Sequence, residues 1–594
     1  MYVRRRARLR ALATVAGLAA VVAATVSAPP ALAAPSPEAA ACPDAYPVAD
    51  LTAHQPVNGL TVSSGNTPDG FTGEVLGVLD DGIAPGLDMI IVQLSSDAID
   101  NAGIWAGMSG SPVYAEDGRL IGAVSYGLTW SPSPVAGVTP AADMQALLSG
   151  GGSSATTKAL ADTRHVALPQ RMQQRLVSAG LATPSEAQQG LTRLPLPLGV
   201  SGPVSISRLN TAASRISAPS LLGQPDVLLY KTGAAPADAP GTDEIFPGSN
   251  LAASISYGDL TAGGVGTTTM VCDGQVVGFG HPFDWTGDST LTMHGADAIT
   301  VLKDDIGGSF KLANLTGPVG EITGDHLAGI SGPLGQLPDT TLVESNVTDV
   351  GTGKSRTGDT YVSVPDYLPD VALFAELDNQ DVVFDHVGKG SSLVHFTIEG
   401  TADGEPFTLV HTNRFASPYD ISVESIFETA EDLYRLLNNK FADVTVSAVR
   451  ITTQLDPTYR AYSVGKVERK VGTSYVTLTR HSLVRARPGS TLTLRVTLNS
   501  KVLGAKLETV TVKVPYAPIG AYGELNVGRL RLSGPTPKSF DDLVSNLSNA
   551  PRNDQLSAAV RVFAKNIGGL TSSGSTSVHD VISGSRGFEL RISR

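Results

Sequence analysis

The sequence is poor in cysteine and in aromatic residues. Its 594 residues include two cysteines and three tryptophans, and aromatic residues make up 6% of the chain. Two cysteines without neighbouring histidines do not form a zinc site. Nothing else in the sequence calls for a metal or another cofactor, so we expect none.

The chain also lacks a block of lysines or arginines beyond its first ten residues. Its formal net charge is −13. An acidic chain without a basic patch suits neither nucleic acid nor an anionic membrane surface. Beyond the N-terminal segment, no apolar run is long enough to span a bilayer. We therefore expect no nucleic acid partner and no stable membrane span, and the oligomeric state stays open.

The N-terminal segment has the pattern of a secretory signal peptide. Five arginines precede an apolar run from Ala11 to Ala28, and Ala31-Leu32-Ala33 is a small-residue cleavage signal. We expect residues 1–33 to be removed during bacterial export, leaving a secreted, extracellular protein that is free or held at the cell surface. In an exported protein, Cys42 and Cys272 are expected to pair in a disulfide, the alternative being two free thiols.

Glycine is abundant, with 63 residues that separate short apolar or alternating segments. This pattern favours a mainly β fold. Clear alternation after Ala442 indicates a β-sandwich-like module near the C-terminus. Ser425–Glu428 has the spacing of a helix capping box, and another helix is expected to start near Ser539.

The segment Gly107–Gly127 begins with the pattern G-x-S-G-x-P. A serine hydroxyl is a weak nucleophile unless a histidine accepts its proton and donors stabilise the oxyanion. Small residues around Ser109 allow a sharp turn, in which backbone N–H groups from Gly107, Met108 and Ser109 can form that oxyanion hole. Ser109 and Ser111 are the candidate nucleophiles. The structural alternative is a glycine-rich turn before a hairpin.

Among ten histidines, His281 is the best placed to act as a general base. It follows the second strand of an expected hairpin that turns at Asp273-Gly274, and a strand end presents a side chain from a rigid edge. His54 lies in a polar leader, and His294 falls in a strand–loop segment.

Three segments resemble the SpoIVB-type serine peptidases. Gly103–Gly127 resembles the serine segment of that family. GGVGTTTMV followed by VVGFGH, which ends at His281, resembles its histidine segment, and residues 317–335 resemble the stretch that follows the histidine. The segments together cover less than half of the chain.

The resemblance implies a chymotrypsin-like double β-barrel and endopeptidase activity on other exported proteins, with self-processing as an additional role. By position, Ser109 carries over as the nucleophile and His281 as the general base. From the glycine turn itself, Gly107 and Met108 are the expected oxyanion residues.

Two features depart from the family pattern. The serine segment comes first here, whereas the histidine segment comes first in the family. The family's acid lies upstream of the serine, where an ungapped match places Leu94. Asp97 is the nearest carboxylate, and Asp100 and Asp284 are alternatives.

The expected parts of the chain follow from these assignments. They are a signal peptide at 1–33, a leader at 34–56, a serine-bearing β-barrel half at 57–150, a connector at 151–249, a histidine-bearing β half at 250–415 and a C-terminal helix plus β-sandwich-like module at 416–594.

A second function from a different class stays open. A catalytically inactive exported relative on the same fold would bind a protein or a cell-surface polymer, and the missing acid and inverted order favour it. A ligand-binding glycine loop is a weaker alternative, because no helix follows the loop and the chain is acidic.

Overall fold

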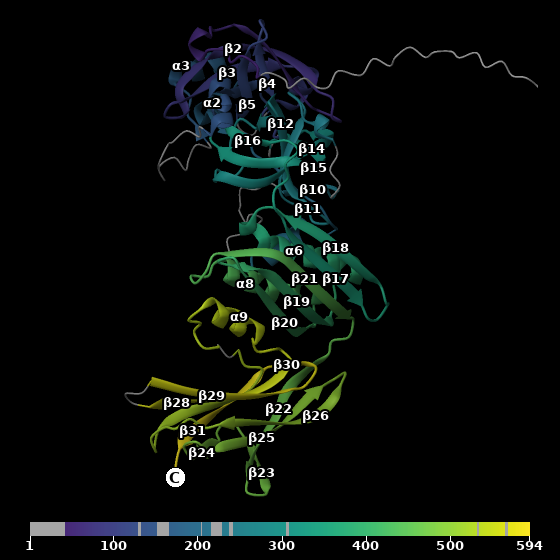
Figure 1. Cartoon of the computed structure of the whole chain (residues 1–594), viewed down its shortest axis with the longest axis vertical. Helices are drawn as coiled ribbons and strands as arrows, with labels where there is room; N and C mark the ends of the chain where they lie inside the picture. The colour runs from purple at the N-terminus through teal and green to yellow at the C-terminus, as the bar shows by residue number, and fades with distance from the viewer. Residues whose placement is uncertain are drawn as a thin grey trace, which may run out of the picture. The chain divides into compact units, whose positions relative to one another are not determined.

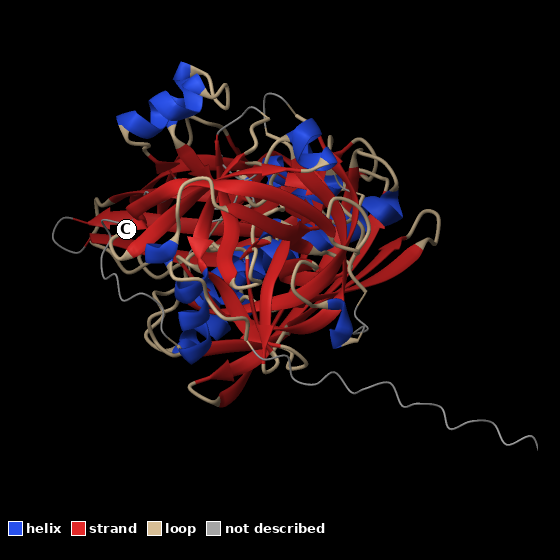
Figure 2. Cartoon of the chain, turned by 90° about the horizontal axis from the view of Figure 1, so that it is seen from above, coloured by secondary structure: helices blue, strands red, loops and turns tan. Residues whose placement is uncertain are grey.

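The computed structural model describes residues 42–128, 132–150, 165–203, 205–215, 229–236, 241–304, 308–531, 534–564 and 568–594. The expected signal peptide lies outside these residues. Strands dominate the described chain (Figure 2), which confirms the mainly β class. No helix in this part of the chain is long and apolar enough to cross a membrane.

A closed barrel of six strands forms the first part, coloured purple to blue in Figure 1. Its elements and their neighbours are β1 (Pro56–Thr61), β2 (Asp69–Ala84), β3 (Leu87–Ser95), α1 (Asp97–Ala102), β4 (Pro112–Ala115), β5 (Leu120–Leu128), β6 (Val135–Pro140), α2 (Ala141–Ala146), β7 (His165–Val166), α3 (Gln170–Ser178), α4 (Pro184–Gln189) and β8 (Leu191–Arg193). The pairing runs β1-β2-β3-β6-β5-β4 and returns to β1, while β8 and β7 extend the sheet beyond β5.

The barrel interior anchors the segment that leads to Ser109. Ile90, Val92 and Leu94 lie at alternate positions of β3 and share one face of that strand. They belong to the same buried cluster as Trp105 and Met108, which lie between α1 and β4. Burial of these two large side chains fixes the chain just before Ser109.

The second part is one extended sheet with helices packed on it. Its elements are β9 (Leu198–Val200), α5 (Ile206–Ala213), β10 (Leu229–Lys231), β11 (Asn250–Gly258), β12 (Ala262–Cys272), β13 (Gln275–Gly278), β14 (Gly287–Leu302), β15 (Phe310–His326), β16 (Gly329–Pro333), β17 (Thr341–Asp349), β18 (Ser355–Val362), α6 (Leu368–Phe384), β19 (Gly390–Ala402), β20 (Glu405–Ser417), α7 (Ile421–Ser425), α8 (Phe427–Leu437) and β21 (Val444–Asp456).

Six of these strands also pair in a closed circuit. The pairing runs β11-β12-β13-β16-β15-β14 and returns to β11. The sheet continues from β11 through β18, β17, β21 and β19 to β20. β21 therefore belongs to this sheet, although the expected boundary at residue 415 assigned its residues to the C-terminal module.

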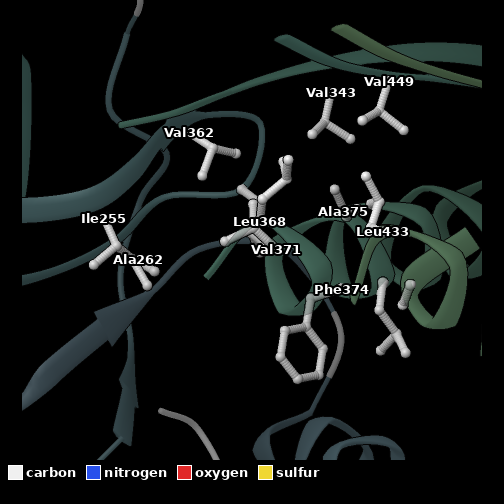
Figure 3. Packing of buried hydrophobic residues seen from close by; sticks show 14 of the residues in the cluster. Ile255, Ala262, Val343, Val362, Leu368, Val371, Phe374, Ala375, Leu433 and Val449 are labelled. Carbon is white, nitrogen blue, oxygen red and sulfur yellow. The ribbon is translucent and has the colours of Figure 1, made fainter. Parts of the chain in front are cut away.

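Helices α6 and α8 cover the second half of this sheet. Leu368, Val371 and Ala375 of α6 pack in one buried cluster with Val343 of β17 and Leu433 of α8 (Figure 3). Apolar side chains of α6 lie on all faces of the helix, and nearly all of its side chains are buried.

The capping box expected at Ser425–Glu428 is wrong. The Ser425 hydroxyl donates to the carbonyl of Ile421 at 2.7 Å and does not cap α8. The reason is that α7 ends at Ser425, so this serine lies inside a helical turn. The cap belongs to α7 instead, where the Asp420 side chain accepts from the N–H of Val423.

A β-sandwich forms the C-terminal part, as expected. Its elements are β22 (Ala461–Val471), β23 (Ser474–Leu478), β24 (Leu483–Ala486), β25 (Thr491–Ser500), β26 (Gly504–Lys513), β27 (Tyr522–Gly528), α9 (Phe540–Ser548), β28 (Gln555–Ala564), β29 (Gly568–Ser577), β30 (Val581–Ser583) and β31 (Ser585–Ile592). The strands form two five-stranded sheets around one buried apolar cluster, whereas Phe540 and Leu547 of α9 pack in the cluster that also contains α6 and α8. Ser539 caps α9 by accepting from the N–H of Asp542, as expected.

The disulfide expected from the sequence joins Cys42 to Cys272, with 4.8 Å between their Cα atoms. It links the start of the described chain to the end of β12, across 230 positions of sequence. The N–H of Tyr46 also donates to the carbonyl of Leu120 on β5. The leader is therefore tied to both closed circuits.

Candidate active site

Ser109 lies in a tight turn between α1 and β4. The N–H of Met108 donates to the carbonyl of Trp105 at 3.1 Å, and the N–H of Ser111 donates to the carbonyl of Met108 at 2.9 Å. Gly110 has a φ of 96°, a conformation that glycine adopts without strain. A Cβ at this position would lie 1.9 Å from the carbonyl oxygen of Thr267, so only glycine permits the close approach to β12.

Strand β12 holds the serine turn by donating hydrogen bonds to three carbonyl groups of the turn. The N–H of Thr267 donates to the carbonyl of Ser109 at 2.7 Å. The Thr267 hydroxyl donates to the carbonyl of Gly107 at 3.2 Å, and the Thr269 hydroxyl donates to that of Gly110 at 2.8 Å. We call this set of three hydrogen bonds the turn clamp. It fixes the position of Ser109 relative to β12.

Lys311 supports the other side of the turn. Its N–H donates to the carbonyl of Ala106 at 2.8 Å, and a Cβ at Gly107 would lie 2.8 Å from its Cβ. Its Nζ donates to Oδ1 of Asn250 at 2.8 Å. Burial lowers the pKa of Lys311 to about 7. Sequence patterns did not reveal this lysine, because its role depends on a strand pairing far along the chain.

His281 is presented by the hairpin that contains β12. β12 and β13 meet at Asp273-Gly274, where both residues have positive φ values, which confirms the expected hairpin. The chain then leaves β13 through Phe279 and Gly280, both with a φ of 67°. Phe279 is buried, and a positive φ in such a residue costs on the order of 1–3 kcal/mol. This local strain turns His281 toward the serine.

Ser109 and His281 form a hydrogen-bonded pair. Nε2 of His281 lies 2.8 Å from Oγ of Ser109, and Nδ1 lies 2.8 Å from the carbonyl oxygen of Pro282. A carbonyl only accepts, so Nδ1 carries the proton and Nε2 of the neutral ring accepts from the serine hydroxyl. This is the tautomer that a general base requires.

The pair is buried, with Ser109 0% and His281 1% exposed. Burial lowers the pKa of His281 to about 3, the charge of Arg193 adds to that decrease, and the Pro282 carbonyl opposes it. At neutral pH the imidazole is therefore uncharged and can accept a proton.

None of the expected carboxylates contacts His281. Asp97 is exposed in the first turn of α1, where a negative charge favours the helix N-terminus. Asp100 accepts from the Ser95 hydroxyl, and Asp284 accepts from the Tyr367 hydroxyl at 2.6 Å. Within the described ranges no carboxylate is bonded to His281, and the Pro282 carbonyl takes the orienting position.

Asp325 of β15 shapes the loop after His281, and sequence reasoning missed it. This fully buried carboxylate accepts from the N–H groups of Phe283 at 2.7 Å, Asp284 at 2.8 Å and Thr286 at 3.3 Å. Burial raises its pKa, and these hydrogen bonds act against that change. The only sequence signal was its place in the segment 317–335, which resembles the peptidase family.

The serine turn offers two backbone donors. The N–H groups of Gly107 and Ser109 have no acceptor among the residues that the structure describes. The N–H of Met108, expected in the oxyanion site, instead donates to Trp105 within the turn. The two available donors are separated by one residue, a spacing that serine peptidases use for an oxyanion hole.

The other candidate serine, Ser111, faces away from His281. Its hydroxyl donates to the hydroxyl of Thr61 at 2.9 Å and lies 3.3 Å from that of Thr267. The structure therefore brings Ser109 and His281 together and gives Ser111 a supporting role between β1, β4 and β12.

A second buried serine–histidine pair lies in the sheet. Oγ of Ser254 is 2.8 Å from Nε2 of His294, whose Nδ1 donates to the carbonyl of Thr316 at 2.9 Å. Ser254 lies inside β11, which pairs with β12 and with β14 at this residue. Ser254 lies in a strand paired on both sides, next to a bulge between Ser254 and Ser256, and not in a glycine turn like that of Ser109, so we assign this pair a structural role.

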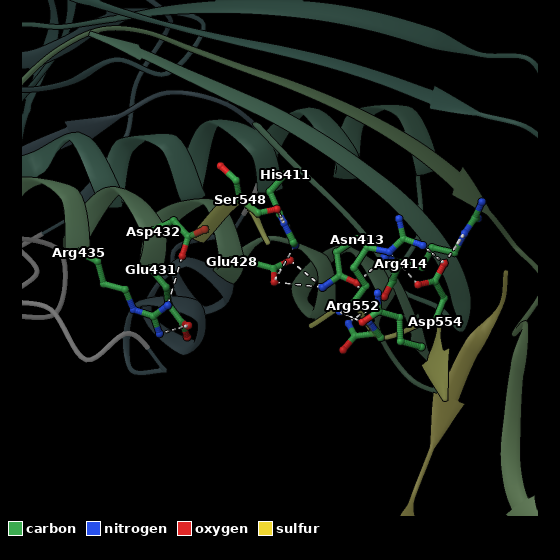
Figure 4. Close-up of polar contacts among 12 residues, drawn as sticks. His411, Asn413, Arg414, Glu428, Glu431, Asp432, Arg435, Ser548, Arg552 and Asp554 are labelled. Carbon is green, nitrogen blue, oxygen red and sulfur yellow. Dashed lines mark hydrogen bonds and ion pairs between the residues drawn. The ribbon is translucent and has the colours of Figure 1, made fainter. Parts of the chain in front are cut away.

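A further polar cluster surrounds α8 (Figure 4). His411 lies 3.5 Å from Glu428, and Nδ1 of His411 donates to the carbonyl of Ser548. Burial raises the pKa of the neighbouring Asp432 to about 7. The serine of this cluster takes part through its backbone, so the cluster provides no nucleophile.

Comparisons with protein-family models, with curated proteins and with solved structures found no match.

We predict that Asp325→Asn lowers the free energy of unfolding by about 1–3 kcal/mol, because an amide nitrogen would face an N–H group that needs an acceptor. Thermal and denaturant unfolding measure the change. Asp284→Asn, at an exposed carboxylate in the same loop, is the matched control and should have a smaller effect. Equal stability of Asp325→Asn and wild type would contradict this role.

We also predict that stability falls as the pH is lowered from 6.5 toward 3. The pKa of His281 falls from 6.5 to about 3 on folding, so in this window the unfolded chain binds a proton that the folded chain does not. Each such histidine contributes a slope of about 1.4 kcal/mol per pH unit. Denaturant titrations at several pH values should show a smaller slope for His281→Gln. Equal slopes in wild type and His281→Gln would contradict this assignment.

Proposed function

We propose that this protein is an exported serine endopeptidase that cleaves protein or peptide substrates with Ser109 and His281. The proposal is supported by two features that occur together at Ser109. The serine is bonded to the base nitrogen of a neutral histidine, and it lies on a glycine turn with two available N–H donors. The Ser254–His294 pair has the same 2.8 Å distance but no such turn.

The proposed reaction uses groups of this chain alone. Oγ of Ser109 attacks the carbonyl carbon of the scissile bond while its proton passes to Nε2 of His281. The N–H groups of Gly107 and Ser109 stabilise the oxyanion. His281 then donates the proton to the departing amine nitrogen. A water molecule, activated by the same histidine, hydrolyses the acyl ester and restores Ser109.

The strand circuits support a chymotrypsin-like arrangement. One closed circuit leads into the serine turn, and the other leads, through β13, into His281. The SpoIVB-type peptidases, which three segments of the sequence resemble, have the two halves in the opposite order. That inversion is compatible with catalysis, because a serine–histidine pair is defined by its geometry and not by its order in the chain.

The Pro282 carbonyl makes this a weaker catalytic group than a full triad. A carbonyl orients the ring as a carboxylate does, but it carries no charge to stabilise the imidazolium that forms during catalysis. Burial further disfavours that ion. We expect turnover well below that of triad enzymes.

The second candidate function is a catalytically inactive relative that binds a protein or a cell-surface polymer. Two observations favour it, namely the absence of a carboxylate on His281 among the described residues and the complete burial of Ser109. In this alternative the Ser109–His281 hydrogen bond would only stabilise the fold.

Labelling with a fluorophosphonate probe separates the two functions. The mature protein should be labelled, slowly because the site is buried, and labelling should be lost in Ser109→Ala and in His281→Gln. Ser254→Ala removes another buried hydroxyl bonded to a histidine, so it is the matched control and should keep the wild-type rate. Labelling that persists in Ser109→Ala would contradict the proposal.

A further inference from the structure

The Ser109–His281 pair is closed to any peptide substrate in this structure. Both residues are buried, at 0% and 1% exposure. An endopeptidase substrate must reach Oγ of Ser109 as an extended chain, which usually pairs with an exposed strand edge. The segment Leu191–Val200, which we call the strap, lies where two such edges meet.

The strap pairs with both sides of the site. Its first strand, β8, pairs with β5, and Arg193 lies opposite Tyr126. Its second strand, β9, pairs with β12, and Leu198 lies opposite Gly264. Because β12 provides the turn clamp, the strap joins the serine-bearing sheet to the strand that holds Ser109.

Leu194 of the strap contacts residues that neighbour the reacting pair. The N–H of Leu194 donates to the carbonyl of Ser125, and Cβ of Ser125 lies 3.1 Å from where a Cβ of Gly280 would be. Gly280 directly precedes His281. Leu194 also packs in the buried cluster that contains Met108, the residue before Ser109.

The second leucine, Leu196, packs on β12, the strand that provides the turn clamp. A Cβ on Gly264 would lie 2.6–2.9 Å from side-chain atoms of Leu196, so this leucine covers the bare backbone of β12. Leu196 packs against a different apolar cluster from Leu194. Arg193 of the strap pairs with Tyr126 of β5, and its positive charge lowers the pKa of His281.

We propose that the strap occupies the substrate groove of the peptidase as a built-in inhibitor. The substrate would be an extended peptide that pairs with the same edges of β5 and β12. It would carry two apolar side chains separated by one residue, as Leu194 and Leu196 are. This inference rests on the proposed function and adds its substrate class and its regulation.

Two prolines make the strap suitable for this role. Pro195 and Pro197 follow the two leucines. Proline fixes φ near an extended value and removes a backbone N–H, so the strap loses little entropy when it is ordered. An inhibitor of this kind competes with substrate at high effective concentration, because it belongs to the same chain.

The test compares the rate of fluorophosphonate labelling in wild type and in Leu194→Ala/Leu196→Ala. Shortening both leucines should open the site and raise the rate about tenfold or more, since the reactive fraction of molecules increases. Val177→Ala is the matched control, because this residue lies on connector helix α3, which packs on β2, and should leave the rate unchanged. If the double variant does not fold, the single variant Leu196→Ala replaces it in the comparison, because this position is only half-buried.

A peptide added in trans provides an independent measurement. The peptide LTRLPLPLGV, which has the sequence of the strap, should suppress labelling of the opened variant, and a version with aspartate at the positions of Leu194 and Leu196 should not. Equal labelling rates in wild type and the opened variants would overturn the strap proposal and leave the proposed function standing. If folded wild type and folded opened variants all remain unlabelled, the proposed function fails.

Discussion

The site depends on the turn clamp between the serine turn and β12. Two backbone segments meet so closely that Gly110 cannot carry a side chain, and three carbonyl groups of the turn accept hydrogen bonds from Thr267 and Thr269. The same hairpin leads into His281. A single pair of strands thus sets the positions of both reacting groups, which explains how residues 172 positions apart in sequence lie within hydrogen-bond distance.

In this site, backbone and loop contacts hold His281 in place where a triad would use a carboxylate. The Pro282 carbonyl selects the tautomer of His281, and the Asp325 carboxylate fixes the loop that follows it without touching the ring. Orientation is therefore provided, while charge stabilisation of the imidazolium is not. In the peptidase that we propose, the buried, neutral histidine and the strap favour a resting state in which the serine is prepared but shielded from water and substrate.

Sequence patterns predicted the parts of this account that local chemistry determines. The mainly β class follows from glycine-separated strands, and the β12–β13 hairpin follows from Asp273-Gly274. Ser109 and His281 were selected from the G-x-S-G-x-P turn, the strand that ends at the histidine and the resemblance to SpoIVB-type peptidases. The role of Asp325 and the position of the strap depend on contacts between distant strands, which no short pattern contains. No sequence pattern marks the Pro282 carbonyl, because a backbone group is present at every residue.

The most direct test of the central claim is to identify the serine that carries the phosphonate adduct by peptide mass spectrometry, using the strap-opened variant. The account predicts a single adduct on Ser109, since within the described part of the chain only that hydroxyl combines a histidine base with available oxyanion donors. An adduct on Ser111 or Ser254 would contradict it, because the turn clamp would then not select the reactive residue.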